Sequence, residues 1–139
     1  MICDAAGTPL VVKTTPANVR DDRPALALIQ SIPSIQGPRG RPCHKPRSIV
    51  GDRGYGFPTL IAAVSALCII AALAPRGSEH GSGLGELRWV VERTMSWFGN
   101  FRRIKFCYER LGRHFQAFHH LAAALICAGR LIHPIEDTS

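Results

Sequence analysis

A run without charged side chains, from Phe57 to Pro75, most constrains how this chain can fold. It is mostly Ala, Leu, Ile and Val, and its length approaches the roughly 20 apolar residues that cross a bilayer. However, Pro58 stands near its start, Ser65 interrupts its middle, and the composition becomes Ile-rich around Cys68. We therefore predict a short helix over 58–67 and a buried strand over 68–73, because buried strands read as continuous apolar runs. A small membrane protein built on 57–75 is an alternative.

The charge balance favours a polyanionic partner. Seventeen Lys and Arg residues against ten Asp and Glu residues give a net charge of +7, which attracts nucleic acid first and an anionic membrane surface second. The five cysteines form no Cys-x-x-Cys pair, so neither a disulfide framework nor a thiolate zinc site is indicated. The N-terminus lacks a basic segment followed by an apolar one, so no signal peptide is expected. These features predict a protein of the reducing cytoplasm.

The other elements follow from hydrophobic periodicity and turn residues. In chain order, the predicted strands are 2–5, 9–15, 47–51 and 68–73, and the predicted helices are 22–32, 58–67, 86–105 and 113–132. The last helix is apolar over most of its surface, so we expect it to be well buried. This alternation predicts an α/β layer in which helices pack on a sheet, within one domain over 1–139. Residues 33–47, rich in Pro, Gly and basic side chains, predict an exposed cationic loop.

Two acidic residues occupy positions that allow either a catalytic or an ordinary structural role. At 100° per residue, the helix over 86–105 places Leu87, Val91 and Phe98 on its buried face, with Arg88 and Glu92 on the stripe beside it. Such a pair is also an ordinary surface ion pair. Asp52 follows a predicted strand, where an aspartate is often a turn or cap residue. Periodicity alone leaves both interpretations open.

A long motif block decides between them. Residues 83–104 read GLGELRWVVERTMSWFGNFRRI, and Tyr108-Glu-Arg follows. This block closely resembles the glutamate region of insertion-sequence-five-type DDE transposases, whose typical wording is RWVVERT-x-x-W-x-x-x-FRRL-x-x-x-YER. Upstream, Gly40-Arg-Pro and Gly51-Asp-Arg-Gly-Tyr resemble that family's basic loop and second-aspartate motif. Residues 7–10 and 15–21 resemble its preceding hairpin, so the resemblance covers nearly the whole chain in order.

The resemblance implies an RNase H-like fold, truncated at the N-terminus, with a C-terminal helical pair in 86–132. It implies that Asp52 is the second catalytic acid and Glu92 the third, and that both bind metal. Two Mg²⁺ (or Mn²⁺) ions would then support DNA cleavage and joining by phosphoryl transfer, since paired ions activate the attacking oxygen and stabilise the leaving one.

The expected partner is DNA, as the element's terminal repeats and as the target, in the bacterial cytoplasm or nucleoid and without a membrane. A homo-oligomer or a complementing transposase subunit is a further possible partner. The basic residues expected to contact DNA are Arg39, Arg41, Lys45, Arg47, Arg88, Arg102, Arg103 and Lys105.

This chain also departs from the family pattern. The first catalytic aspartate belongs to a strand before the hairpin, upstream of Ile2, and Asp4 matches a non-catalytic aspartate instead. Gly85 stands where related transposases often carry a tyrosine, and Gly99 where they often carry a base; Arg102 and Arg103 could replace the missing base. We therefore expect an inactive C-terminal transposase fragment. The alternative is a non-catalytic DNA-binding or regulatory remnant.

Overall fold

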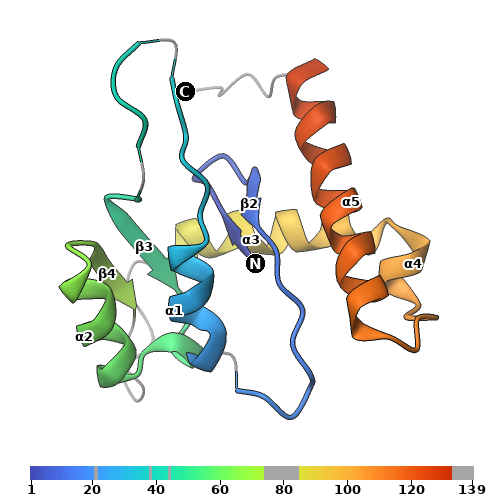
Figure 1. The fold of residues 1–139 in the computed structure, drawn as a ribbon, viewed down its shortest axis with the longest axis horizontal. Helices are drawn as coiled ribbons and strands as arrows, with labels where there is room; N and C mark the ends of the chain where they lie inside the picture. The colour runs from blue at the N-terminus through green and yellow to red at the C-terminus, as the bar shows by residue number, and fades with distance from the viewer. Residues whose placement is uncertain (21, 38, 44, 74–84, 133–139) are drawn as a thin grey trace. The chain divides into compact units, whose positions relative to one another are not determined.

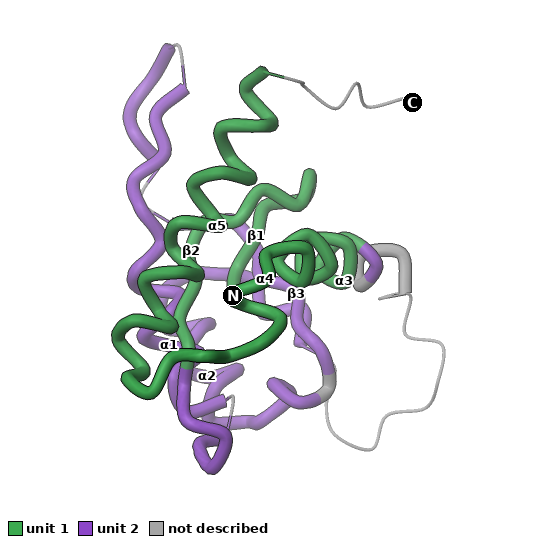
Figure 2. The backbone as a smooth tube through the Cα atoms, turned by 90° about the vertical axis from the view of Figure 1, so that its right-hand side faces the viewer, with its two compact units in different colours: residues 1–14, 90–139 green, residues 15–89 purple. Residues whose placement is uncertain are grey.

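The computed structural model describes residues 1–20, 22–37, 39–43, 45–73 and 85–132. The chain divides into two compact units, Met1–Thr14 with Val90–Ser139 and Thr15–Trp89, which are coloured separately in Figure 2. Figure 1 shows the elements, which follow the predicted order of strands and helices. Two elements were not predicted, the 3-10 turn Arg53–Tyr55 and the short helix α4 (Arg102–Lys105).

The first unit begins with the predicted hairpin. Strands β1 (Ile2–Cys3) and β2 (Pro9–Val11) pair antiparallel and are shorter than expected. The Asp4 carboxylate accepts a hydrogen bond from the backbone N–H of Thr8 at 2.7 Å, which closes the turn. Gly7 adopts a φ of 85°, a left-handed conformation that glycine tolerates and other residues rarely adopt. Local turn chemistry therefore fixes this hairpin.

Helix α3 (Gly85–Gly99) packs on the hairpin turn through a face that differs from the predicted one. Among the described residues of α3, Val90, Thr94 and Phe98 are buried, as was predicted for Phe98, whereas Val91 and Met95 are exposed. The prediction that Val91 faces the core was therefore wrong, and the side chain of Leu87 lies outside the described residues. The buried face differs from the predicted one because the polar residue Thr94 is buried. Its hydroxyl lies 2.9 Å from each of two carbonyl oxygens, those of Gly7 and Val90, which satisfy it.

The single helix expected over 86–105 is interrupted. Helix α3 ends at Gly99, and the N–H groups of Asn100 and Phe101 bond to Trp97 and Phe98 in a tighter terminal turn. Helix α4 follows after this break. Glycine is among the poorest helix formers, which accounts for an end at this position.

Helix α5 (Gly112–Ile132) docks on the segment that follows β2. The Gln116 side chain accepts hydrogen bonds from the N–H and hydroxyl of Thr14, at 2.5 and 2.8 Å, and donates to the Val12 carbonyl at 2.8 Å. The His120 ring lies 3.2 Å from the same Val12 oxygen. One side of α5 is thus fixed to the hairpin strand by polar contacts.

The expectation that this last helix is well buried was wrong. Ala122 is its buried residue, while Leu121 and Leu125 are exposed and Leu131 is 85% exposed. Apolar composition shows that a helix can be covered, but it does not show which faces are covered. By length and composition alone, α5 is also a helix that could cross a bilayer.

The second unit contains a parallel strand pair joined by a helix. Strand β3 (Ser48–Gly51) pairs with β4 (Ile70–Leu73) in register from Ser48↔Ile70 to Gly51↔Leu73, and α2 (Pro58–Ala66) connects them. Helix α1 (Asp22–Gln30) packs against α2. Among the described residues of this unit, the buried hydrophobic side chains are those of Ala25, Ile29, Leu60, Val64, Ile69 and Leu73.

The uncharged run behaves as predicted in its secondary structure. Its described part forms α2 and then β4, so residues 57–73 are not one continuous membrane-spanning helix. The strand is less buried than expected, because Leu73 is buried but Ile70 is exposed. Cys68 makes the change of direction between helix and strand with a φ of 57°.

The helices and small sheets agree with the predicted α/β class. Within the described residues the strands form two two-stranded sheets, one in each unit, where a single layer was expected. The single domain over 1–139 stays a prediction.

Candidate functional site

Asp52 lies at the carboxyl end of a strand. It directly follows Gly51, the last residue of β3, and it is exposed. Its carbonyl oxygen accepts a hydrogen bond from the N–H of Tyr55 at 2.9 Å, which closes the 3-10 turn. A Cβ atom at Gly51 would lie 2.6 Å from the Cδ2 atom of Leu73, so a larger residue here would have to displace that buried side chain. The strand pairing thus fixes the backbone that presents the Asp52 carboxylate to solvent.

Glu92 is exposed on α3. At 100° per residue, it points to the side of the helix opposite Val90 and Thr94. Periodicity predicted that Glu92 lies at the edge of the core, and this prediction was wrong because α3 buries Val90 and Thr94 instead of Val91. Arg88 belongs to α3, but its side chain lies outside the described residues.

Asp52 and Glu92 belong to different compact units. Their convergence on one metal site therefore stays a prediction. Within the residues that the structure describes, no three His, Cys, Asp or Glu side chains gather as a metal site would require.

The basic loop over 33–47 closes on itself. Ile35 and Cys43 exchange two backbone hydrogen bonds, at 3.0 and 2.8 Å, in an isolated antiparallel bridge. Arg39 and Arg41 lie between the bridged residues and are exposed. The loop thus presents two guanidinium groups on a hairpin, whereas the sequence had indicated only an exposed cationic segment.

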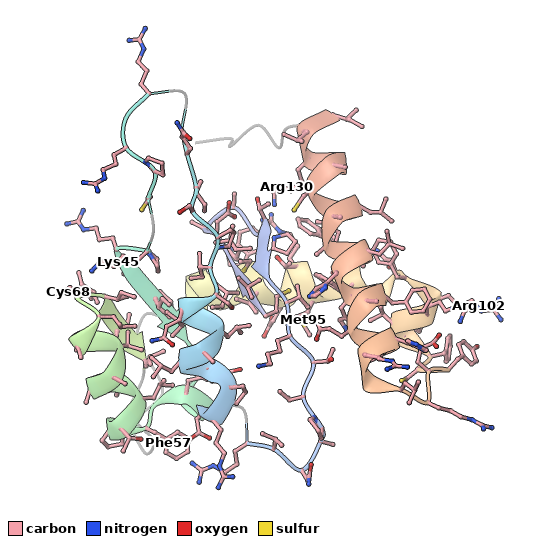
Figure 3. The ribbon with its side chains drawn as sticks, viewed as in Figure 1. Lys45, Phe57, Cys68, Met95, Arg102 and Arg130 are labelled. Carbon is pink, nitrogen blue, oxygen red and sulfur yellow. The ribbon has the colours of Figure 1, made fainter. Side chains whose placement is uncertain are left out.

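Lys45 has a structural contact besides its predicted DNA role. Its ammonium donates a hydrogen bond to the carbonyl oxygen of Leu67 at 2.8 Å. Leu67 is the C-cap residue of α2, where the helix dipole favours a positive charge. Figure 3 shows Lys45 near Cys68, which follows this helix end. Arg47 is also exposed. Its carbonyl oxygen accepts a hydrogen bond from the N–H of Ile70, which extends the pairing of β3 with β4 by one residue.

The second basic group lies on α4. Arg102 is exposed and extends away from the helix in Figure 3. Arg103 pairs with Glu109 at 2.7 Å and lies over the ring of Phe118. Lys105 lies 5.7 Å from the ring centroid of Phe106. Aromatic side chains therefore accompany the cations of this segment.

Two further arginines were missed by the sequence analysis. Arg93 and Arg130 both donate to the carbonyl oxygen of Ala6, at 2.8 and 2.6 Å, and both guanidinium groups lie over the ring of Trp97. Arg130 is partly buried on a largely apolar helix, where a charged group needs a polar partner. A charged residue within this apolar stretch of sequence was the available signal.

Comparison with known proteins identifies the family. The chain matches the transposase DDE domain over residues 1–127. A putative transposase for insertion sequence element IS402 of Burkholderia cepacia is 45% identical over 127 residues, which is 91% of this chain and 60% of that relative. The chain thus spans about 60% of the length of the curated relative that it matches. No solved structure matches the chain. With the transposase match covering most of its length, the chain belongs to the transposase DDE family.

Proposed function

We propose that this chain supplies the second and third acidic residues of an RNase H-like transposase catalytic domain that cuts and joins DNA. The observation that supports the proposal is the setting of Asp52, an exposed carboxylate at the carboxyl end of a parallel strand, in a chain of the transposase DDE family. Glu92 is the second ligand, exposed on α3 within the block that matches the family's glutamate region.

The donor chemistry of these two residues fits hard divalent cations. Mg²⁺ and Mn²⁺ prefer carboxylate oxygens, and both side chains are accessible to solvent. A bound pair of such ions would activate the attacking oxygen and stabilise the negative charge on the leaving oxygen. Asp52 and Glu92 would hold the ions, the first from the end of β3 and the second from α3.

The basic residues would bind and orient the DNA backbone. Arg39, Arg41 and Arg47 are exposed in the second unit, and Arg102, Arg103 and Lys105 are exposed on α4. Contacts to phosphate fix the register of a protein on DNA without reading its sequence. The substrates would be the element's ends and the target, and the expected compartment is the bacterial cytoplasm with its nucleoid.

Metal-directed backbone cleavage tests the acidic pair without requiring activity. Fe²⁺ replaces Mg²⁺ in oxygen-rich sites, and with added hydrogen peroxide and ascorbate it reduces the peroxide to hydroxyl radicals that cut the nearby polypeptide, while ascorbate returns Fe³⁺ to Fe²⁺. We expect cuts near residues 52 and 92, and their loss in an Asp52→Asn/Glu92→Gln double variant. Asp4→Asn is the matched control, because Asp4 is also exposed but the resemblance gives it no catalytic role.

Cleavage that is unchanged in the double variant, or absent near both residues, would overturn the metal assignment. If DNA binding persisted in that case, the better description would be a DNA-binding or regulatory remnant without catalysis.

A further inference from the structure

The segment that joins α4 to α5 exposes two aromatic rings. Phe106 is 52% exposed and Tyr108 is 58% exposed, and their ring centroids lie 6.3 Å apart at an interplanar angle of 40°. Leu111, three residues further on, is also exposed. Large apolar side chains gathered on a surface commonly mark a binding site.

The backbone around these rings is held in place. The N–H of Phe106 bonds to the Arg102 carbonyl at 3.0 Å, which ties the ring to the end of α4. The Arg103–Glu109 ion pair, at 2.7 Å, spans the segment from one side of the rings to the other. These contacts fix the backbone that carries the rings. A partner that binds the rings would therefore lose less conformational entropy in this segment.

The exposed charged side chains around the rings are basic. Arg102, Lys105, Arg110 and Arg113 are exposed within the same stretch, and its acidic residue, Glu109, is already paired with Arg103. Lys105 also lies 5.7 Å from the Phe106 ring centroid. A partner that covers this surface must bring negative charge together with flat, apolar faces.

An unpaired nucleic acid strand has both properties. Its phosphates match the cations, and its bases expose faces that stack on aromatic rings. In a duplex the base faces are covered by neighbouring bases, and only the edges can be reached from the grooves. The Phe106 ring has no hydrogen-bonding group with which to read an edge, so its exposure favours an unstacked base.

We propose that residues 102–113 bind an unpaired DNA strand, with Phe106 and Tyr108 stacking on bases and the flanking arginines contacting phosphates. This inference rests on the proposed function, since it names the form of DNA that this surface takes. In a cut-and-join reaction, such a strand arises where the ends of the element are separated.

The test measures the affinity of the 139-residue chain for a labelled single strand of mixed sequence and for the matching duplex, by fluorescence anisotropy. Phe106→Ala and Tyr108→Ala should each weaken single-strand binding by roughly 5- to 100-fold, as expected for the loss of one stacked base. Duplex binding should change much less. Leu121→Ala is the matched control, because Leu121 is 55% exposed on α5, outside residues 102–113, and its loss removes exposed apolar surface without removing a ring.

Two leucine variants separate stacking from general apolar contact. Phe106→Leu and Tyr108→Leu keep an apolar side chain but lose the ring, so they should weaken single-strand binding nearly as much as alanine does. Tyr108→Phe should bind like the unchanged protein. Leucine variants with unchanged single-strand affinity would overturn the stacking proposal.

The outcomes distinguish this inference from the proposed function. If the chain bound neither single strands nor duplex in a salt-dependent way, the proposed DNA role itself would fail. If duplex binding were tight and salt-sensitive while all ring variants bound single strands normally, only the stacking inference would be overturned. Sedimentation velocity adds a third outcome: ring variants that change the oligomeric state but not DNA affinity would assign the rings to an interface between copies.

Discussion

The hydroxyl oxygen of Thr94 lies 2.9 Å from the carbonyl oxygen of Gly7, and the two residues are 87 positions apart in the chain. This contact joins the buried face of α3 to the β1–β2 turn. A Cβ atom at Gly7 would lie 2.8 Å from the same hydroxyl and 3.2 Å from Arg93. The turn and the helix therefore depend on a glycine at this position for two reasons, backbone conformation and space.

Replacing Gly7 with alanine should lower the free energy of unfolding by more than the roughly 1–2 kcal/mol that a left-handed conformation costs an ordinary residue. The added methyl group must also displace Thr94 or Arg93. Gly40→Ala is the matched control, because Gly40 has a φ of 102° with no atom within 4 Å of its Cβ position. Urea unfolding of both variants gives the comparison, and equal losses would show that the contact with Thr94 does not matter.

The Thr94–Gly7 contact also shows which features of the fold are local enough to be predicted from the sequence. The order of the elements was predictable because periodicity and turn residues act locally, as in the Gly7 turn and the helix that begins at Pro58. The buried face of α3 was not predictable, because Thr94 is buried only where distant carbonyls satisfy its hydroxyl. The exposure of Leu131 on α5 was missed because apolarity does not reveal which surface has a partner.

The candidate site shows the same division. The position of Asp52 after a strand followed from the apolar residues just before it, and the structure confirms this local placement. The outward direction of Glu92 depended on the correct face of α3 and was missed. The contact of Lys45 with Leu67 joins residues 22 positions apart, so no local pattern could predict it.

The five cysteines should differ in reactivity. Burial raises the pKa of the Cys3 and Cys127 thiols above the ordinary value of 9.0, so less thiolate is present at a given pH. Cys43, Cys68 and Cys107 are exposed. Iodoacetamide at mildly alkaline pH should therefore label the exposed three first, as measured by mass spectrometry of the peptides.

Denaturation provides the control for that experiment, because in urea the five thiols should react at similar rates. The raised pKa values of Cys3 and Cys127 also make the stability of the fold depend on pH. A thiol with a raised pKa in the folded state stabilises the fold fully below pH 9.0, and this contribution is lost as the pH rises through the raised value. Faster labelling of Cys3 or Cys127 than of Cys43 in the folded protein would contradict the assignment.

The two kinds of basic residue in the 33–47 loop should respond differently to mutation. An Arg39→Gln/Arg41→Gln double variant should reduce the slope of log affinity for DNA against log salt by roughly 1.8, at about 0.9 for each phosphate contact. Its thermal stability should be unchanged, because both side chains are exposed on the loop hairpin.

Lys45→Met is the contrasting variant, since it keeps the length of the side chain but loses the hydrogen bond to Leu67. It should lower the free energy of unfolding by about 0.5–1 kcal/mol, the usual net contribution of one hydrogen bond. Salt titrations and urea unfolding of both variants test the distinction. A salt slope that the arginine variant left unchanged would remove the loop from the DNA-binding surface.

The last prediction concerns catalysis by residues 1–139 as an isolated polypeptide. Asp52 and Glu92 provide two of the three carboxylates that the resemblance implies, and two carboxylates leave a two-ion site without its bridging ligand. We therefore expect this polypeptide neither to cut nor to join DNA carrying the element's ends with Mg²⁺ or Mn²⁺. A version extended upstream to include an aspartate-bearing strand should do both, and Asp52→Asn or Glu92→Gln should abolish the activity of that version. Gel electrophoresis of end-labelled DNA measures nicking and joining.

If the 139-residue polypeptide nicked DNA and the Asp52→Asn/Glu92→Gln variant did not, the third carboxylate would have to come from Asp4 or from a second subunit. Mixing the double variant with an Asp4→Asn variant would then decide between these sources, because only subunits that share one site can restore activity to each other.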